Sequence, residues 1–394
     1  MAFGDMKLLV GFACFLILSS AGVEGRRKYV GEDLELERQL KILNKPAVKI
    51  VKTEDGDLFD CVDIHKQPAF DHPLLRNHKI QMKPSFVSES TVHGDPIAGK
   101  PVQLGLKQEG CPSGTVPIRR THKQDLIRAK FFRNFRKRFA APVSDYDYGD
   151  GDEHRQVGYA AALIASEDQL YGTSFWLNVW GLGLGVNQSS SATTWVQNGE
   201  EVMSAGWMVN PTQFGDNRTR LFQAWTKDNF KTGCINMLCP GFVQVDDRVP
   251  LGIAFNVLSS YEGTQHEILL RLSKDLSMGN WWLFYGGNTA VGYWPQELFT
   301  KVSAFATSIS WGGEAIGPYN ENKPPMGSGD YAEEGFKKAC YFRTIQLMDN
   351  KNAFYDPKQS QLINGTDEDW YQSIDQGLLG DPWRHTYYFG GPGF

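Results

Sequence analysis

The side chains that most often carry catalysis are arranged in ways that exclude the common site types. The sequence has no G-x-S-x-G elbow, no phosphate-binding loop and no H-E-x-x-H zinc motif. Most of its histidines lie in the first third of the chain, which leaves His154, His266 and His385 for the remainder. His266 could belong to a Ser-His-Asp triad, but no spacing singles it out. Carboxyl groups are the remaining candidates for acid–base chemistry.

The cysteines indicate disulfides rather than a metal site. Cys234 and Cys239 are close enough for a small loop bridge, and Cys61 and Cys111 could close a second bridge in the amino-terminal part. A zinc site would need a second ligand pair that the sequence does not supply. We therefore expect these two disulfides, no metal and no cofactor, with Cys340 left over.

Residues 1–25 have the pattern of a removable signal peptide. Lys7 precedes the apolar run 8–18, and small residues follow it. The run is too short to span a bilayer, and no later stretch reaches about 18 apolar residues, so we expect no membrane contact in the mature form. Secretion also agrees with the N-glycosylation motifs at Asn187, Asn217 and Asn364.

The charge is divided unequally along the chain. Residues 26–141 carry 23 Lys+Arg and 14 Asp+Glu, and residues 142–394 carry 16 and 29, so the net charges are +9 and −13. Chance is one explanation; the other is that the basic segment docks electrostatically on the acidic one. Arginines interleaved with Phe in 119–138 resemble a nucleic-acid arm, but a secreted chain with an acidic main part argues against nucleic acid as a partner.

The periodicity divides the chain into regions. Residues 32–43 have apolar residues at helical spacing, and the proline-punctuated stretch after them favours extended arms. Residues 142–154 form an acidic linker, and from residue 155 onward the period is two. We expect a mainly β protein, an antiparallel β-sandwich preceded by a small α+β or extended segment. The expected strands are 174–180, 220–225, 241–245, 251–258, 266–273, 280–286 and 303–311.

Several segments resemble the plant neprosin family in order and spacing. They include CPSGTVPIRR, SAGWMVNP, GDNRTRLFQAWT, TGCINMLCPGFVQ, GYWPQELF and WGGEA, and the resemblance covers nearly all of residues 30–390. It implies a signal peptide (1–25), an activation or inhibitory propeptide (26–141), a linker (142–154) and a β-sandwich glutamic peptidase domain (155–394). It also implies cleavage at proline, proline-containing peptides or proteins as partners, the propeptide as an intramolecular inhibitor, and an apoplast or cell-wall location.

The resemblance implies two catalytic glutamates, of which this chain keeps one. Glu314 stands in the motif Trp-Gly-Gly-Glu, whereas Ser204 occupies the position before Ala-Gly-Trp where the family has the other glutamate. Hydrolysis by paired carboxyls needs one group to take a proton and another to supply one. Serine does neither at ordinary pH, although its hydroxyl donates a hydrogen bond.

Neighbouring glutamates do not obviously replace the missing one. Glu201 falls on the opposite face of a strand from Ser204, and Glu200 would lie roughly 13 Å away along it. Glu297 is a more distant candidate for the same cleft.

Four residues are candidates for substrate binding. Trp207, Tyr293 and Trp294 are either core aromatics or a platform for proline, and Gln244 is a candidate for polar support.

These observations predict a secreted, glycosylated protein of the glutamic peptidase type whose hydrolysis is impaired because residue 204 is serine. The alternative is a non-catalytic extracellular binding protein for proline-rich or glycan ligands. A third possibility is a storage or structural β protein, for which a change at Glu314 has no effect.

Overall fold

The computed structural model describes residues 33–85, 98–106, 110–132, 155–228, 231–319, 321–358, 362–366 and 370–394. The expected signal peptide 1–25 and linker 142–154 lie outside the described residues. Within those residues the strands form three sheets, and nearly all pairs are antiparallel. The prediction of a mainly β, antiparallel fold is confirmed.

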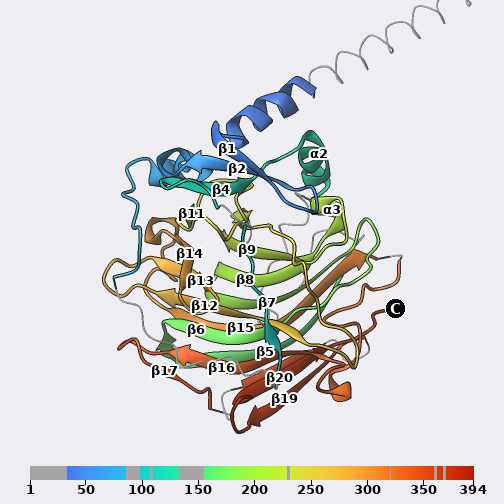
Figure 1. The fold of residues 1–394 in the computed structure, drawn as a ribbon. Coiled ribbons are helices and arrows are strands. Elements are labelled where there is room, and N and C mark those ends of the chain that lie inside the picture. Colours follow the sequence, from blue (N-terminus) through green and yellow to red (C-terminus); the bar gives the residue numbers. More distant parts are fainter. Residues whose placement is uncertain are drawn as a thin grey trace, which may run out of the picture.

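The amino-terminal part, residues 33–132, is a small α+β unit. Residues 33–43 are helical, as the periodicity predicts. A three-stranded sheet follows in the order β1-β2-β4, and the Cys61–Cys111 disulfide links β2 to the segment before β4. Figure 1 shows this sheet at one end of the molecule, close to β9 and α3. The elements are β1 (Ala47–Lys52), β2 (Leu58–Asp63), η1 (Ile64–Lys66), η2 (Pro68–Asp71), η3 (Pro73–Leu75), β3 (Lys100–Pro101), β4 (Thr115–Arg119) and α2 (Lys123–Phe132).

The remaining chain forms two larger sheets. One has seven strands in the order β10-β9-β8-β7-β15-β5-β18. Its strands are β5 (Arg155–Leu170), β7 (Ser189–Asn198), β8 (Glu201–Val209), β9 (Arg220–Lys227), β10 (Thr232–Ile235), β15 (Ala306–Pro318) and β18 (Leu362–Thr366), and α3 (Pro211–Phe214) joins β8 to β9.

The other sheet has ten strands, with the main order β11-β14-β13-β12-β6-β16-β20-β19. Short β3 of the amino-terminal part pairs with β12, and β17 pairs with β16. Its remaining elements are β6 (Gly172–Asn178), β11 (Val243–Gln244), β12 (His266–Lys274), β13 (Trp281–Tyr285), β14 (Thr289–Trp294), η5 (Gln296–Leu298), η6 (Ala332–Glu334), β16 (Cys340–Met348), β17 (Phe354–Tyr355), β19 (Gln372–Leu378) and β20 (His385–Gly390).

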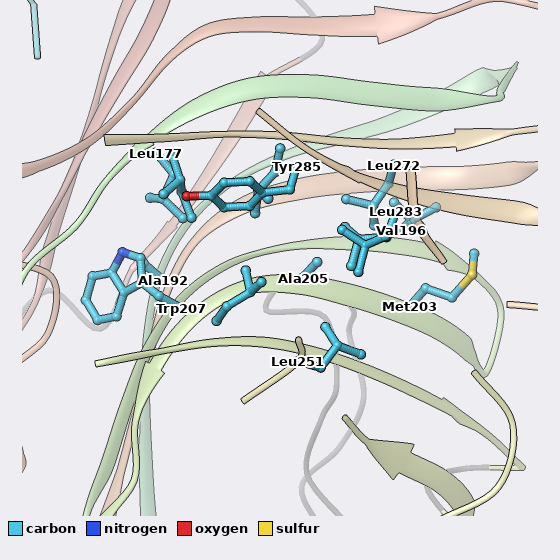
Figure 2. Close-up of a cluster of buried hydrophobic side chains, with 14 of the residues drawn as sticks. Leu177, Ala192, Val196, Met203, Ala205, Trp207, Leu251, Leu272, Leu283 and Tyr285 are labelled. Atoms are coloured by element: carbon cyan, nitrogen blue, oxygen red, sulfur yellow. The ribbon is translucent and has the colours of Figure 1, made fainter. Parts of the chain in front are cut away.

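The main core lies between the two large sheets. Trp207 on β8 donates its indole N–H to Asn178 O on β6 (2.8 Å), and Trp311 on β15 donates to Thr173 Oγ1 on β6 (3.2 Å). These residues therefore mark the inner face of the seven-stranded sheet. Figure 2 shows Val196, Met203 and Ala205 of that face near Leu272 and Leu283 of the other sheet.

One predicted strand is wrong. Residues 251–258 form turns and a single bridge between Arg220 and Ala254 instead of a continuous strand. Gly252 has a φ of +82°, so the chain turns there while the hydrogen bonds Gly252 N–Leu221 O and Phe255 N–Thr219 O hold it against β9. The apolar run in this segment reflects burial, which a short run of residues does not distinguish from strand structure.

Two glycines allow the central strands to approach closely. A Cβ at Gly206 would lie 2.0 Å from Ala192 O, and one at Gly312 would lie 2.2 Å from Ala160 O. Any side chain would push into the backbone of the neighbouring strand. This explains the glycine of Ala-Gly-Trp and the first glycine of Trp-Gly-Gly-Glu.

We predict that Gly206→Ala lowers the free energy of unfolding by about 2 to 3 kcal/mol, because the backbone oxygen cannot move away without breaking the sheet. Urea unfolding of the full chain measures this. Gly183→Ala is the matched control, since a Cβ there meets no atom within 4 Å. Equal midpoints for the two variants would contradict the close approach.

Candidate functional site

Cross-strand pairing aligns the residues of the outer face, the face of the seven-stranded sheet turned away from the core. Residues directly opposite one another in antiparallel strands share a face. Glu314 pairs with Ser191, which pairs with Met208, and Ser310 pairs with Trp195, which pairs with Ser204. Three rows result: Tyr159–Glu314–Ser191–Met208–Arg220, Ala161–Gly312–Thr193–Gly206–Phe222, and Ser310–Trp195–Ser204–Ala224.

Glu314 is a buried acid at the centre of β15. Only 4% of its surface is exposed, and its Oε2 atom has no hydrogen-bond partner in the described structure. Burial raises the pKa of Glu314 to about 8, against a smaller opposing effect of a hydrogen bond with Tyr159. In this structure Glu314 is therefore a neutral carboxylic acid below that pH, which donates a proton more readily than it accepts one.

The row of Ser204 contains hydroxyl and indole groups. Trp195 lies between Ser204 and Ser310 in the pairing, and all three side chains are buried. The indole N–H of Trp195 and the hydroxyl of Ser310 both lack a partner among the described residues. Buried donors without partners are uncommon in folded proteins and mark places where a ligand can supply the missing bond.

Ser204 and Glu314 share the outer face but do not form a close pair. They are two strands apart and two rows apart, with Gly312, Thr193 and Gly206 between them. At about 4.8 Å per strand and 3.3 Å per residue, their Cα atoms would be about 16 Å apart in a flat sheet. The indole of Trp195 lies between Ser204 and Ser310 on this face, whereas Gly312, Thr193 and Gly206 leave space between position 204 and Glu314.

The other glutamates considered from the sequence lie elsewhere. Glu201 is on the inner-face side of β8, as the alternation predicts, and its carboxylate accepts hydrogen bonds from the backbone N–H groups of residues 300–302. Glu200 lies in the turn before β8. Glu297 accepts from His78 Nδ1 at 3.1 Å, beside β14 of the ten-stranded sheet. None of these three belongs to the three rows.

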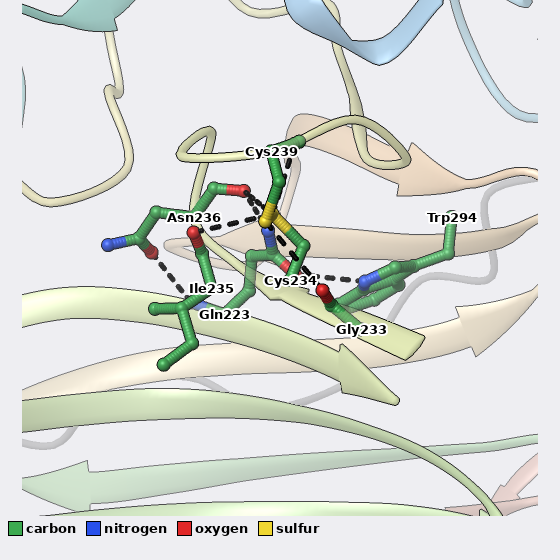
Figure 3. The surroundings of a disulfide bond; sticks show 7 residues. All are labelled: Gln223, Gly233, Cys234, Ile235, Asn236, Cys239 and Trp294. Atoms are coloured by element: carbon green, nitrogen blue, oxygen red, sulfur yellow. Dashed lines mark hydrogen bonds between the residues drawn. A yellow bond between two sulfur atoms is a disulfide. The ribbon is translucent and has the colours of Figure 1, made fainter. Parts of the chain in front are cut away.

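Two of the predicted substrate-binding residues lie in the core. Trp207 is fully buried on the inner face. Trp294 is also buried, and its indole N–H donates to Gln223 Oε1 at 2.9 Å beneath the Cys234–Cys239 loop (Figure 3). The structure thus places both in the role of core aromatics, the alternative that the sequence left open, and not on the outer face beside Ser204 or Glu314.

The other two predicted substrate-binding residues contact the amino-terminal part. Tyr293 lies on the ten-stranded sheet, where its hydroxyl accepts from Gln81 N and bonds to His78 Nε2 at 2.9 Å each. The backbone N–H of Gln244 donates to Gln67 Oε1 at 2.9 Å. Neither residue reaches the rows of Glu314 and Ser204.

Covalent features agree with the sequence where they are described. The disulfides Cys61–Cys111 and Cys234–Cys239 are both present, and Cys340 is a buried free thiol. Asn187 and Asn217 are exposed, whereas the side chain of Asn364 lies outside the described residues.

Two kinds of feature are absent from the described residues. No cluster of His, Cys, Asp or Glu in those ranges could hold a metal ion. No helix there is long and apolar enough to cross a membrane.

Three ion pairs between the two parts run against their net charges. The ion pairs Arg220–Asp57 (2.7 Å), Arg218–Asp57 (3.5 Å) and Arg218–Asp55 (3.5 Å) place carboxylates of the basic amino-terminal part on arginines of the acidic part. These pairs do not test docking through the basic excess as a whole, since His78 of the amino-terminal part also contacts Glu297 of the acidic part at 3.1 Å. Local pairs decide the contact because charges more than about 10 Å apart are screened.

Sequence reasoning missed Trp195 and Ser310. Both belong to alternating patterns, Ser191-Thr193-Trp195 and Ser310-Gly312-Glu314, and the period of two would have assigned each set to one face. Their pairing across β7 is a long-range register that no local pattern contains.

Comparisons with known proteins give a family and a distant structural likeness. The model of the Neprosin family matches residues 186–392, and that of the Neprosin activation peptide matches residues 50–162. The crystal structure of scytalido-glutamic peptidase with a transition state analog inhibitor is 10% identical, with 60% of this chain and 98% of that one covered and a TM-score of 0.29. SCP-B, a member of the Eqolisin family of peptidases, gives the same coverage and identity with a TM-score of 0.27. Likeness at these TM-scores carries no functional conclusion.

We predict that Glu314→Gln changes how stability depends on pH. An unfolded glutamate ionises near pH 4.5 and the folded one near 8, so unfolding releases a proton in this window and the wild type loses stability as pH rises. Glutamine has no proton to release. The stability of the variant relative to wild type should therefore increase by ~3 kcal/mol between pH 4 and pH 7.

Urea unfolding of the full chain at both pH values measures this difference, and Glu200→Gln, in an exposed turn, is the matched control. A difference between Glu314→Gln and wild type that is the same at pH 4 and pH 7 would contradict a buried neutral carboxyl.

Proposed function

Because the chain belongs to the neprosin family, we propose that it is a peptidase-type protein that binds proline-containing peptides on its outer face and hydrolyses them poorly or not at all. One observation carries this proposal. Of the two positions that the family resemblance assigns to catalytic carboxyl groups, position 204 holds serine and Glu314 alone is an acid, with both on the outer face.

The geometry explains the expected loss of hydrolysis. A water held between two acids needs them within a few ångströms of it; carboxyl pairs that hold a nucleophilic water in glycosidases are about 6.5–9.5 Å apart. Of the two family positions, this chain has a carboxyl group at Glu314 and none at Ser204, so no such pair forms. Serine supplies no base at ordinary pH. Losing one acid–base group costs about 10² to 10⁴ in rate.

Glu314 alone is a poor substitute. Its raised pKa keeps it protonated through the acid range, so it cannot take a proton from water there. Contact with solvent would remove the desolvation and lower its pKa, but the missing second group would still leave the developing oxyanion without an acid.

The same face retains features of a binding site. The indole N–H of Trp195 and the hydroxyl of Ser310 are buried without a partner among the described residues, so both would donate to peptide carbonyl groups once this face is uncovered. The Trp195 ring supplies an aromatic surface of the kind that packs against proline. These groups support peptide binding without turnover.

The amino-terminal part is an intramolecular partner of the domain, as the match to the activation peptide shows. We propose that it also inhibits the domain, because its hairpin Lys52–Leu58 sits against β9, at the edge of the outer face. Secretion is part of the same proposal and is supported by the two disulfides, which persist in oxidising compartments.

The test is cleavage of a fluorogenic proline-containing peptide from pH 2.5 to 7, with removal of the activation peptide verified in every sample. We predict no turnover for wild type, because Ser204 leaves Glu314 without a second acid. Ser204→Glu supplies that acid on the same face and should gain turnover at least ~100-fold above Ser204→Gln, which has the same size but no acid.

The other outcomes discriminate between the alternatives. No turnover by Ser204→Glu would show that a carboxyl group at position 204 does not pair with Glu314, which would contradict this explanation of the lost hydrolysis. Wild-type turnover that Glu314→Gln abolishes would show an active peptidase with one glutamate and overturn the proposal. Absence of peptide binding by wild type would remove the binding function altogether.

A further inference from the structure

The outer face carries a second site, at the end of β9. Arg220 lies in the row of Glu314, three strands away, and its side chain is completely buried. Its guanidinium donates to Asp57 Oδ2 at 2.7 Å, to Asp216 Oδ2 at 2.8 Å and to Gly252 O at 2.8 Å. Arg218 joins the cluster through Asp216 (2.7 Å).

Asp57 comes from the activation peptide, whereas the arginines belong to the domain. Its carboxylate sits at the tip of the β1–β2 hairpin, where Gly56, with a φ of +89°, allows the tight turn. Asp57 is 7% exposed, and both of its oxygens contact Arg220 (2.7 and 3.3 Å). The hairpin thus inserts one carboxylate into a fixed guanidinium fork, an arrangement that favours carboxylates over other groups.

Departure of the activation peptide would leave this cluster short of negative charge. The domain itself supplies both arginines, Arg218 and Arg220. Of the carboxylates that contact them in the described structure, the domain supplies Asp216 alone. Burial alone would raise the pKa of Asp216, yet hydrogen bonds from Arg218 and Arg220 lower it to about 2, so this one negative charge is permanent at working pH. One guanidinium is left to pair with an incoming anion, since a buried unpaired charge is costly.

The position of the cluster fits a peptide that also contacts Ser204. Arg220 is one strand and two rows from Ser204, or about 14 Å by strand spacing and rise. Four residues of extended peptide cover that distance. The apolar cluster of Met208, Phe222 and Ala224 lies between the two positions on the same face.

We propose that Arg218 and Arg220 form a carboxylate-binding subsite, occupied by Asp57 in the full chain and open to a bound peptide afterwards. The ligand is a peptide with an Asp or Glu side chain, or its own terminal carboxylate, three to five residues from the residue over Ser204. This inference rests on the proposed function and names the substrate class of the same face.

The test is binding of labelled proline-containing peptides, measured by fluorescence anisotropy, to the chain nicked once in residues 142–154, after release of the activation peptide has been verified. In one set of peptides a single Asp stands three, four or five residues before or after the proline. Each of these peptides is compared with a matched peptide that has Asn at the same position. A second pair compares a free with an amidated carboxyl terminus and separates the two sources of the carboxylate. We expect the best Asp or free-acid peptide to bind 10- to 100-fold more tightly than its neutral match.

Arg218→Gln should reduce this preference to less than about threefold, and Arg248→Gln, an exposed arginine outside the cluster, should leave it intact. If Arg218→Gln proves unstable, Arg218→Glu tests the same point, because it should transfer the preference from Asp to Lys peptides. Equal binding of Asp and Asn peptides to wild type, or a preference that survives both variants, overturns the subsite.

The readout separates this inference from the proposed function. Binding that depends on the carboxylate but not on proline would contradict the proposed peptide function and leave the subsite standing. Binding or turnover that depends on proline but shows no preference for a carboxylate would contradict the subsite and support the proposed peptide function.

Discussion

The hydrogen-bond register of β7 determines what the outer face can do. This strand pairs with β8 on one side and with β15 on the other. Its register therefore determines which residue of β8 lies in the same row as which residue of β15. Because that register is fixed over nine residue pairs on each side, a shift would move the whole Ser/Thr/Trp set to the wrong row or face. The close approach at Gly206 and Gly312 allows the three strands to keep it. The chemistry of positions 204, 310 and 314 follows from this alignment.

Much of the architecture could be predicted because it depends on local patterns. Period-two alternation identified β6 and β12, short apolar runs bounded by turn residues identified β9 and β13, and the short spacing of Cys234 and Cys239 indicated their bridge. β7 and β8 were not among the predicted strands, since Ser and Thr residues in β7 and Glu, Ser and Gly residues in β8 interrupt their apolar runs. The apolar run 251–258 is the opposite case. Its residues are mostly buried but form no continuous strand, so an apolar run alone led to a wrong strand prediction.

The site was less predictable because motifs give neighbours along the chain and not across the sheet. Ala-Gly-Trp and Trp-Gly-Gly-Glu each place an aromatic ring inward and a different residue outward. The sequence alone cannot say which outward residues face each other, since this depends on pairing through a third strand. Likewise, Trp207 and Trp294 are as suitable for a core as for a binding platform, and their hydrogen bonds to the opposite sheet show that they belong to the core.

The contact between activation peptide and domain shows how local chemistry overrides net charge. Net charge alone would hold a basic segment against an acidic domain by a diffuse attraction that salt weakens. Such an attraction does not determine where on the domain the segment binds. A single buried pair, Asp57 with Arg220, is different, because both groups are removed from water and must be paired with good geometry to be tolerated. Such a pair fixes where the hairpin sits. It also requires that whatever replaces the hairpin brings a carboxylate of its own, so the contact that holds the activation peptide in place also defines what the open face can bind.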